Sequence, residues 1–109
     1  MGLDNSSRVA QEEIFGPVLT VIPHNGDDDA VRIANESPYG LSGAVDSADL
    51  KRAKAVAARI RTGTVGVNGG QWFGADAPFD GYKQSGVGRE MGVPGFEEYP
   101  EIKTIAEPG

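Results

Sequence analysis

The stretch EEIFGPVLTVI, residues 12–22, contains the features from which the rest of this chain can be interpreted. Two carboxylates, a large aromatic residue and a Gly-Pro pair come directly before an apolar run at 18–22. Gly-Pro is a strong turn signal, and proline fixes the backbone φ angle where the run begins. Because the run is nearly continuous in apolar and β-branched residues, we predict a strand that is buried on both faces.

Glu13 and Phe15 precede this predicted strand and should lie on a rigid loop, both pointing the same way if the loop is extended. A carboxylate beside an aromatic ring can hold a ligand that carries both hydroxyl groups and a planar ring. Taken alone, the same two residues can also be interpreted as a solvent-exposed glutamate and a phenylalanine of the hydrophobic core. The choice between these interpretations depends on the rest of the sequence.

The composition describes one small globular domain and excludes several classes of function. The chain has 109 residues, 39% of them hydrophobic and 24% charged, which is ordinary for a soluble protein. The net charge of −6 argues against a nucleic-acid partner. With no cysteine and a single histidine, His24, a disulfide framework, a thiol nucleophile and a metal site are not expected. No leader and no apolar run of membrane-spanning length is visible, so we expect a cytoplasmic protein without a membrane partner.

Downstream of residue 22 the sequence alternates between helix and strand patterns. Three aspartates, at 27–29, are predicted to supply an N-cap and negative charge at a helix start, and this helix must end by Ser37 because Pro38 follows. A second helix, capped by Ser47 or Asp49, carries an apolar stripe and ends before a glycine; the stripe is Leu50, Ala53, Ala57 and Ile60. Strands are predicted at 41–45 and 64–68. The order β-α-β-α-β predicts an α/β fold with parallel strands, whose functional loops follow the carboxyl ends of the strands.

Residues 69–95 depart from this regular pattern. They are rich in glycine and show little periodicity, and we predict a long glycine-rich loop. Loops of this length are uncommon unless they are functional or supported by other structure. Trp72, Phe73 and Phe79 lie within it, so the segment is not a disordered linker. We infer that it packs against protein that this chain does not contain.

The C-terminal residues alternate between apolar and charged side chains. Phe96, Tyr99, Ile102 and Ile105 are spaced among charges, and Pro100 interrupts the run. Proline is tolerated in edge strands, so we predict an edge strand over 97–105, one that could be added to a neighbouring subunit.

Three motifs that suggest nucleotide or nucleophile chemistry fail on inspection. The glycines at 86 and 88 are not followed by the third glycine of a dinucleotide fingerprint at the correct spacing, and no predicted strand precedes them. Gly81 and Gly86 are spaced as in a phosphate-binding loop, but the required lysine and hydroxyl residue do not follow. Ser85 has no histidine near it in the sequence to activate it.

Two separated stretches of the chain resemble one family. EEIFGPV, residues 12–18, resembles the cofactor-contacting motif of the NAD(P)-dependent aldehyde dehydrogenases. PFDGYKQSG, residues 78–86, followed by Gly88, Arg89 and Glu90, resembles their Pro-Phe-Gly-Gly-x-Lys-x-Ser-Gly signature. Residues 34–35, 39–42, 63–68 and 98–104 resemble the family as well, in the same order and spacing. The likeness covers nearly the whole chain.

The resemblance implies that residues 1–95 are the C-terminal part of an aldehyde dehydrogenase catalytic domain and that 96–109 form an oligomerisation strand or tail. The family oxidises an aldehyde to a carboxylic acid by thiolate attack, hydride transfer to NAD or NADP, and thioester hydrolysis. Its nucleophilic cysteine and its main cofactor domain lie upstream of the first motif. The chain alone should therefore be inactive. The implied partners are the aldehyde, the missing N-terminal part and another subunit reached through the C-terminal strand.

The resemblance also assigns roles toward the cofactor. Glu13 matches the carboxylate that holds the ribose hydroxyls next to the nicotinamide, and an ionised carboxylate is a strong acceptor for two hydroxyls. Phe15 matches the aromatic residue that packs beside the nicotinamide.

On the aldehyde side, Phe73 and Phe79 match residues lining the substrate channel, where apolar walls exclude water. Gly69 and Gln71 fall in the variable loop that helps to select the substrate, and Glu90 matches a glutamate of a proton relay. The structural alternatives are that Phe79 is a core or interface anchor and that Glu90 is a salt-bridge partner. Asn68 matches an asparagine that holds the loop at the strand end.

One residue departs from the family pattern. Asp80 stands where the family usually has glycine, so a side chain and a charge enter a tight turn next to Phe79. A rival interpretation of the whole chain is an independent, non-catalytic module that associates with a full-length relative. The choice of aldehyde and of NAD or NADP is not decided by these residues.

Overall fold

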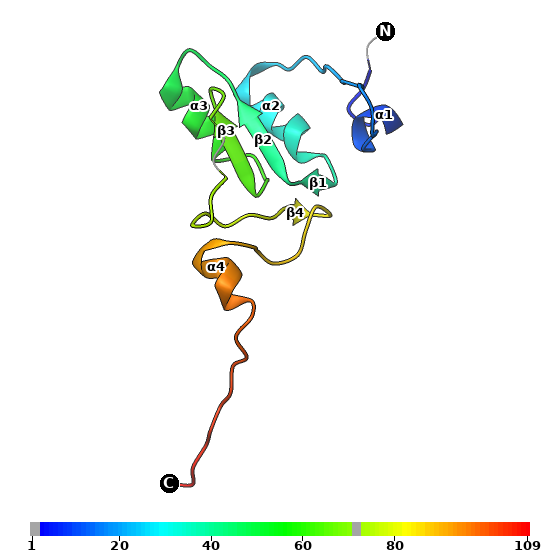
Figure 1. Ribbon diagram of the computed structural model, residues 1–109. Coiled ribbons are helices and arrows are strands. Elements are labelled where there is room, and N and C mark those ends of the chain that lie inside the picture. The colour runs from blue at the N-terminus through cyan, green and yellow to red at the C-terminus, as the bar shows by residue number, and fades with distance from the viewer. Residues whose placement is uncertain (1–2, 71–72) are drawn as a thin grey trace.

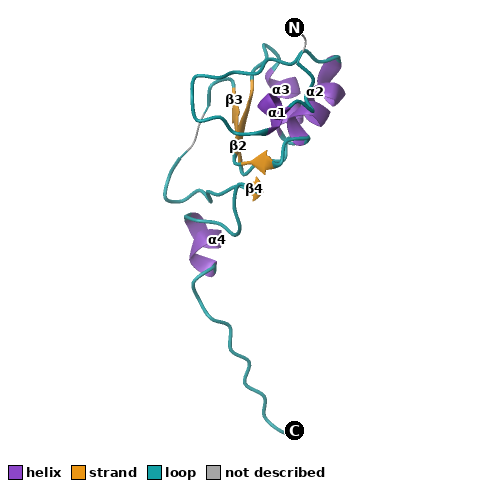
Figure 2. Cartoon of the chain, turned by 90° about the vertical axis from the view of Figure 1, so that its right-hand side faces the viewer, coloured by secondary structure: helices purple, strands orange, loops and turns teal. Residues whose placement is uncertain are grey.

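The computed structural model describes residues 3–70 and 73–109 (Figure 1). Its elements are α1 (Arg8–Gln11), α2 (Gly26–Asn35), β1 (Tyr39–Gly40), β2 (Ser42–Val45), α3 (Leu50–Ala57), β3 (Thr64–Val67), β4 (Tyr82–Lys83) and α4 (Gly92–Glu97). Strands β2 and β3 are parallel, with Ser42 opposite Thr64 and Val45 opposite Val67, and α3 connects them. The α/β class with parallel strands is therefore confirmed. Helix α3 packs against both strands, and Figure 2 shows α2 and α3 on the same side of the sheet.

Acidic residues stand at the start of both long helices, but the aspartate N-cap predicted for α2 was wrong, because α2 begins at Gly26 and its N-cap is Asn25. The Asp49 carboxylate accepts a hydrogen bond from the Arg52 amide (3.1 Å) and caps α3. In α2 the Asp29 carboxylate accepts from the Asn25 amide (2.9 Å), one turn back. The stripe of α3 buries Ala53 completely, while Leu50 at its N-terminal end stays 51% exposed.

The strand predicted at 18–22 is not present, and this prediction was wrong. Val18, Leu19 and Val21 are 52%, 86% and 77% exposed, and the segment belongs to no strand of the structure. An apolar run indicates burial, but a strand also needs a neighbouring ladder of backbone groups, and the described part of this chain provides none here. The predicted five-element unit is therefore reduced to α2, β2, α3 and β3.

The glycine-rich segment from 69 onward is more ordered than its sequence suggests. Strand β4 pairs antiparallel with β1, Tyr39 opposite Lys83, and an isolated bridge joins Phe79 to Glu90. Helix α4 follows and was not predicted, because glycine and proline within so short a segment are unfavourable for a helix. These pairings join residues far apart in the sequence, so no local pattern predicts them.

The C-terminal residues 98–109 form no strand within this chain, contrary to the predicted edge strand. They run away from the body of the molecule as an extended segment (Figure 1), with Tyr99, Ile102 and Ile105 83%, 98% and 82% exposed. A strand needs a partner edge, and this segment lies beside none. Its pairing with a neighbouring subunit stays a prediction.

The hydrophobic core is small for a chain of this length. Among the described residues only Val31 (7% exposed) and Ala53 are buried hydrophobic side chains. Many large hydrophobic residues are exposed instead, including Phe15, Val87 and Phe96. Such an extent of exposed apolar surface is uncommon in a monomeric protein and marks surface that associates with other protein. None of the helices in the described ranges has the length and apolarity to span a membrane.

Candidate functional site

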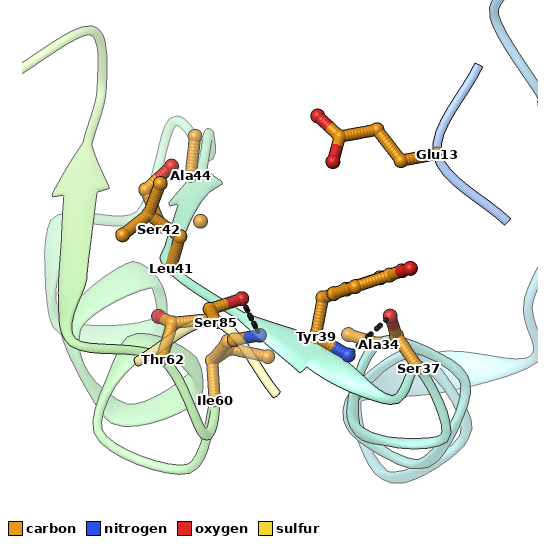
Figure 3. A pocket seen from close by; sticks show the side chains of 12 residues that line it. Glu13, Ala34, Ser37, Tyr39, Leu41, Ser42, Ala44, Ile60, Thr62 and Ser85 are labelled. Carbon is orange, nitrogen blue, oxygen red and sulfur yellow. Dashed lines mark hydrogen bonds between the residues drawn. The ribbon is translucent and has the colours of Figure 1, made fainter. Parts of the chain in front are cut away.

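An open groove of about 430 Å³ brings together several separate parts of the chain (Figure 3). One wall is the segment from the end of α2 through β1 into β2, and Ser85 closes the base. A second wall is formed by Ile60 and Thr62 at the end of the α3 region, a name used here for α3 together with the turn that follows it (residues 50–62). Glu13 reaches toward the groove from the opposite side, on the loop that follows α1 (Figure 3). The lining residues are Glu13, Ala34, Ser37, Tyr39, Gly40, Leu41, Ser42, Gly43, Ala44, Ile60, Thr62 and Ser85.

The two residues predicted to contact a cofactor are placed differently. Glu13 lines the groove, and its carboxylate points into the open space rather than into protein (Figure 3). Phe15 does not line the groove and is 95% exposed. The structure thus brings Glu13 to the same groove as Ser85, which lies in the second motif, while the role of Phe15 stays a prediction.

Residues 79–90, here called the signature loop, are fastened to β1 and to α2. The Gly40 amide donates to Ser85 Oγ (2.9 Å), and the Gln84 amide donates to the Pro38 carbonyl (3.1 Å). Lys83 Nζ donates to the carbonyls of Asn35 and Ser37 (2.8 Å each), at the end of α2. Burial lowers the pKa of Lys83, and the positive charge of Arg61 lowers it further.

The predicted channel residues Phe73 and Phe79 lie together at the start of the signature loop, and Glu90 stands at its other end. The rings of Phe73 and Phe79 meet edge to face, with centroids 5.3 Å apart and planes at 78°. Phe79 and Glu90 exchange two backbone hydrogen bonds (2.8 and 2.7 Å). Phe73 remains 70% exposed, so the pair presents an aromatic surface outward. The aromatic pair and Glu90 are therefore side by side, although they do not line the groove that contains Glu13.

The turn after β3 positions the variable loop. Asn68 and Gly69 both have positive φ angles, 51° and 76°, which an asparagine and a glycine adopt most readily. The Asn68 side chain accepts a hydrogen bond from the Ser47 amide (2.9 Å), which confirms its predicted structural role at the strand end. Gln71, predicted to help select the substrate, and Trp72 lie outside the described residues.

Asp80 fits into the turn because Gly86 has no side chain. The Asp80 carboxylate accepts from the Gly81 amide (2.5 Å) and lies against Gly86, where a Cβ would come within 1.7 Å of Oδ1. The charge predicted to enter this turn is thus accommodated inside the loop.

Sequence reasoning missed the part that Asn35 plays in supporting the site. Its side-chain amide donates to the Arg59 carbonyl (2.9 Å) and accepts from the Arg61 amide (2.8 Å), which joins the end of α2 to the end of the α3 region. Asn35 and Lys83 both lie in stretches that resemble a family motif, and this was the only signal in the sequence that could have identified them.

A second cavity of about 210 Å³ lies at the start of α2 and contains a charged pair. The Arg52 guanidinium donates to both Asp27 carboxylate oxygens (2.6–3.0 Å), and this hydrogen bond is the main reason that the pKa of Asp27 is lowered. Within the described ranges, no three histidine, aspartate or glutamate side chains are grouped as metal ligands would be.

Comparison with known proteins gives a consistent result. The family model described as "Aldehyde dehydrogenase family" matches residues 1–105. A 3-succinoylsemialdehyde-pyridine dehydrogenase from a Pseudomonas species is 55% identical over 97 residues, 89% of this chain and 20% of the relative. Betaine aldehyde dehydrogenase from Bacillus subtilis is 48% identical over 102 residues, 94% of this chain and 21% of the relative.

Solved structures give the same result. Betaine aldehyde dehydrogenase from Staphylococcus aureus in complex with NAD+ matches with a TM-score of 0.83 and 49% identity, over 89% of this chain and 19% of that one. Aldehyde dehydrogenase C (C291A) from Pseudomonas syringae, complexed with NAD+ and octanal, matches with a TM-score of 0.81 and 55% identity, over 89% and 20%. The chain thus spans about a fifth of the length of these relatives.

Proposed function

This chain belongs to the aldehyde dehydrogenase family, and we propose that it supplies the C-terminal part of the catalytic unit of an enzyme that oxidises an aldehyde to a carboxylic acid with NAD or NADP. Residues 1–95 would complete the catalytic domain, and 96–109 would pair with a neighbouring subunit in a homo-oligomer. Related structures hold NAD+, which supports a nicotinamide cofactor for the enzyme to which this chain contributes.

The observation that carries this proposal is the position of Glu13 across the groove from Ser85. The first motif and the signature loop are far apart in the sequence, yet one cavity of about 430 Å³ lies between them. The Glu13 carboxylate faces the open space (Figure 3), so its oxygens are available to accept hydrogen bonds from two hydroxyl groups. A nicotinamide nucleotide, when bound, supplies a hydride acceptor carried on a ribose with such hydroxyls. The role of Glu13 is to orient that ribose, and Phe15, fully available on the same loop, would pack beside the ring.

The aldehyde side of the site is proposed for the aromatic pair. Phe73 and Phe79 offer an exposed edge-to-face surface that would wall a channel and exclude water from an apolar substrate. Glu90 is exposed and is bonded through its backbone to Phe79, which supports a role in moving a proton near the bound aldehyde. Gly69 and Gln71 would contribute to the choice of substrate from the loop after β3.

The chain contains no cysteine, so the thiolate that attacks the aldehyde in this family has to come from other protein. The test compares the intact enzyme that carries this sequence with the isolated chain, each with a panel of aldehydes and NAD or NADP. We expect absorbance of the reduced cofactor to rise with the intact enzyme and not with the chain. Turnover by the isolated chain would contradict the assignment of the nucleophile to other protein.

A second candidate is a non-catalytic module that associates with a full-length relative, and the extent of exposed apolar surface favours it as well. An antibody raised against this chain separates the two in lysates of the source cells. A band several times larger than this chain supports the enzyme, and a band at the mass of the chain itself supports the module. The same antibody, applied to cell fractions, tests the cytoplasmic location that we also propose.

A further inference from the structure

We propose that Lys83 is a positioning residue of the aldehyde site, whose ammonium group ties the signature loop to the C-terminal end of α2 and thereby fixes where Phe79 and Glu90 stand. The proposal rests on the proposed function in one respect, namely that Phe79 and Glu90 serve the aldehyde.

The signature loop is closed on itself, so its position depends on contacts made to the rest of the fold. Its ends are joined by the two backbone hydrogen bonds between Phe79 and Glu90. Inside it, the Asp80 carboxylate lies against Gly86, and the Arg89 guanidinium lies 5.1 Å from the centre of the Tyr82 ring. A loop closed in this way moves largely as one body, and whatever holds its middle also holds the residues at its ends.

The backbone contribution to that attachment is short. Strands β1 and β4 pair over only two residues each, Tyr39 opposite Lys83 and Gly40 opposite Tyr82. The hydrogen bonds from the Gln84 amide and to Ser85 Oγ add two further links to the same segment. These contacts fix the loop to β1 and to Pro38 directly before it, and none of them reaches the helices.

The Lys83 side chain supplies the link to the helices. Its ammonium donates to the carbonyls of Asn35 and Ser37 at 2.8 Å each. Carbonyl groups at the C-terminal end of a helix lack partners within the helix and carry the negative end of its dipole, so a cation is favoured there. Asn35 is itself held to the α3 region by its contacts with the Arg59 carbonyl and the Arg61 amide, which makes this a fixed anchor.

The backbone φ angle of Lys83 indicates that the surrounding protein holds the backbone of this residue as well as its side chain. Its φ angle is 56°, in the left-handed region that residues with a side chain seldom adopt, and the residue is partly buried. A compact ammonium on a flexible stem can reach two carbonyls from this backbone. Methionine has a similar length but neither charge nor donor, whereas arginine keeps both. The two substitutions therefore separate the ammonium contacts from side-chain packing.

The experiment uses the intact enzyme with Lys83→Met and Lys83→Arg, and Lys54→Met as the matched control on the exposed face of α3. For an apolar aldehyde that the wild type oxidises, we expect Lys83→Met to raise the aldehyde KM about tenfold, since displacements of about 1 Å in a site change rates by up to about a hundredfold. The KM for the cofactor should change less than the aldehyde KM, because Glu13 is held by another loop and Ser85 keeps its hydrogen bond from the Gly40 amide. Lys83→Arg should recover much of the loss, and Lys54→Met should match the wild type.

Hydrogen exchange of peptides covering 79–90 provides a second measurement that does not depend on activity. We expect faster exchange there in Lys83→Met, with α3 unchanged, and partial recovery in Lys83→Arg. Wild-type exchange and an unchanged aldehyde KM in Lys83→Met would overturn the proposal. If Lys83→Met fails to fold, Lys83→Arg decides, because equal failure would mean that the ammonium contacts are not responsible. An intact wild type that oxidises no aldehyde would refute the proposed function alone, and the exchange measurement would still judge Lys83.

Discussion

Gly63 lies outside the signature loop, and replacing it by alanine should displace that loop. Gly63 lies between α3 and β3, and its amide donates to the Gly40 carbonyl (3.0 Å). A Cβ at this position would lie 1.7 Å from the Asp80 carbonyl oxygen and 2.9 Å from the carbonyl carbon. Real Cβ atoms keep at least about 3.0 Å from such neighbours, so the Asp80 carbonyl group and the added Cβ have to move apart.

The expected loss of stability in Gly63→Ala depends on which atoms have to move. Overpacking costs about 1–3 kcal/mol, and the obstacle here is backbone rather than the end of a flexible side chain, so we expect about 3 kcal/mol. Asp80 follows Phe79 directly, and a shift of about 1 Å in the wall of a site corresponds to a loss of up to about a hundredfold in kcat/KM for the aldehyde. Gly43→Ala is the matched control for stability only, because Gly43 lines the groove while its Cβ would meet Ile60 and Thr62 side-chain atoms at 3.4 and 3.5 Å, at or near ordinary van der Waals distance.

The assay measures thermal unfolding and steady-state kinetics of both variants in the intact enzyme. We expect Gly63→Ala to lower the Tm and kcat/KM together, while Gly43→Ala keeps a Tm close to that of the wild type. An equal Tm of the two variants would refute the reasoning, since it would show that the close approach of Gly63 to Asp80 does not constrain the loop.

Three further predictions concern other parts of the chain. Glu13→Gln in the intact enzyme should lower kcat/KM for the cofactor about tenfold, because charge-assisted hydrogen bonds are about twice as strong as neutral ones; unchanged single-turnover rates would remove Glu13 from the site. Gly86→Ala alone should lower the free energy of unfolding, but it should be tolerated together with Asp80→Gly, which removes the obstructing carboxylate. A double-mutant cycle measured by chemical denaturation should show a coupling of about 1 kcal/mol or more between the two sites, and additive effects would contradict the packing described. The hydrogen bond from Arg52 holds the pKa of Asp27 below its ordinary value of 3.8. The pair therefore stabilises the fold at neutral pH and loses this effect as the pH falls below 3.8 through the lowered pKa. NMR titration should show the Asp27 pKa rising in Arg52→Met, and an unchanged titration would count against the ion pair.

The sequence predicted those elements whose stabilising contacts are local. The aspartates in the first turn of α2 and the Asp49 cap of α3 follow from patterns within a few residues of each helix. The parallel pairing of β2 with β3 follows from the order strand, helix, strand along the chain. The strand predicted at 18–22 failed because hydrophobicity predicts burial but not a hydrogen-bonding neighbour.

In the candidate site, too, the sequence predicted some features and only the fold decided others. Glu13, Phe79 and Glu90 were selected from the sequence because their motifs resemble a family, and the structure places Phe79 beside Glu90 and Glu13 in the groove closed by Ser85. The anchoring by Lys83 could not be read from any spacing, because its partners are carbonyl groups that every residue has. Only the fold decides which carbonyl groups are left unpaired and within reach.

By itself the sequence determined the family, the α/β class, the absence of a thiol nucleophile from this chain and the residues worth testing, since each depends on residue type and local spacing. The tertiary structure alone decided that residues 79–90 close into one loop and that the ends of α2 and the α3 region hold it through Lys83 and Asn35. Each of those contacts has a backbone group on at least one side, and its two partners are distant in the chain. Backbone groups are chemically alike in all residues, so their partners are set by proximity in space and not by the sequence pattern.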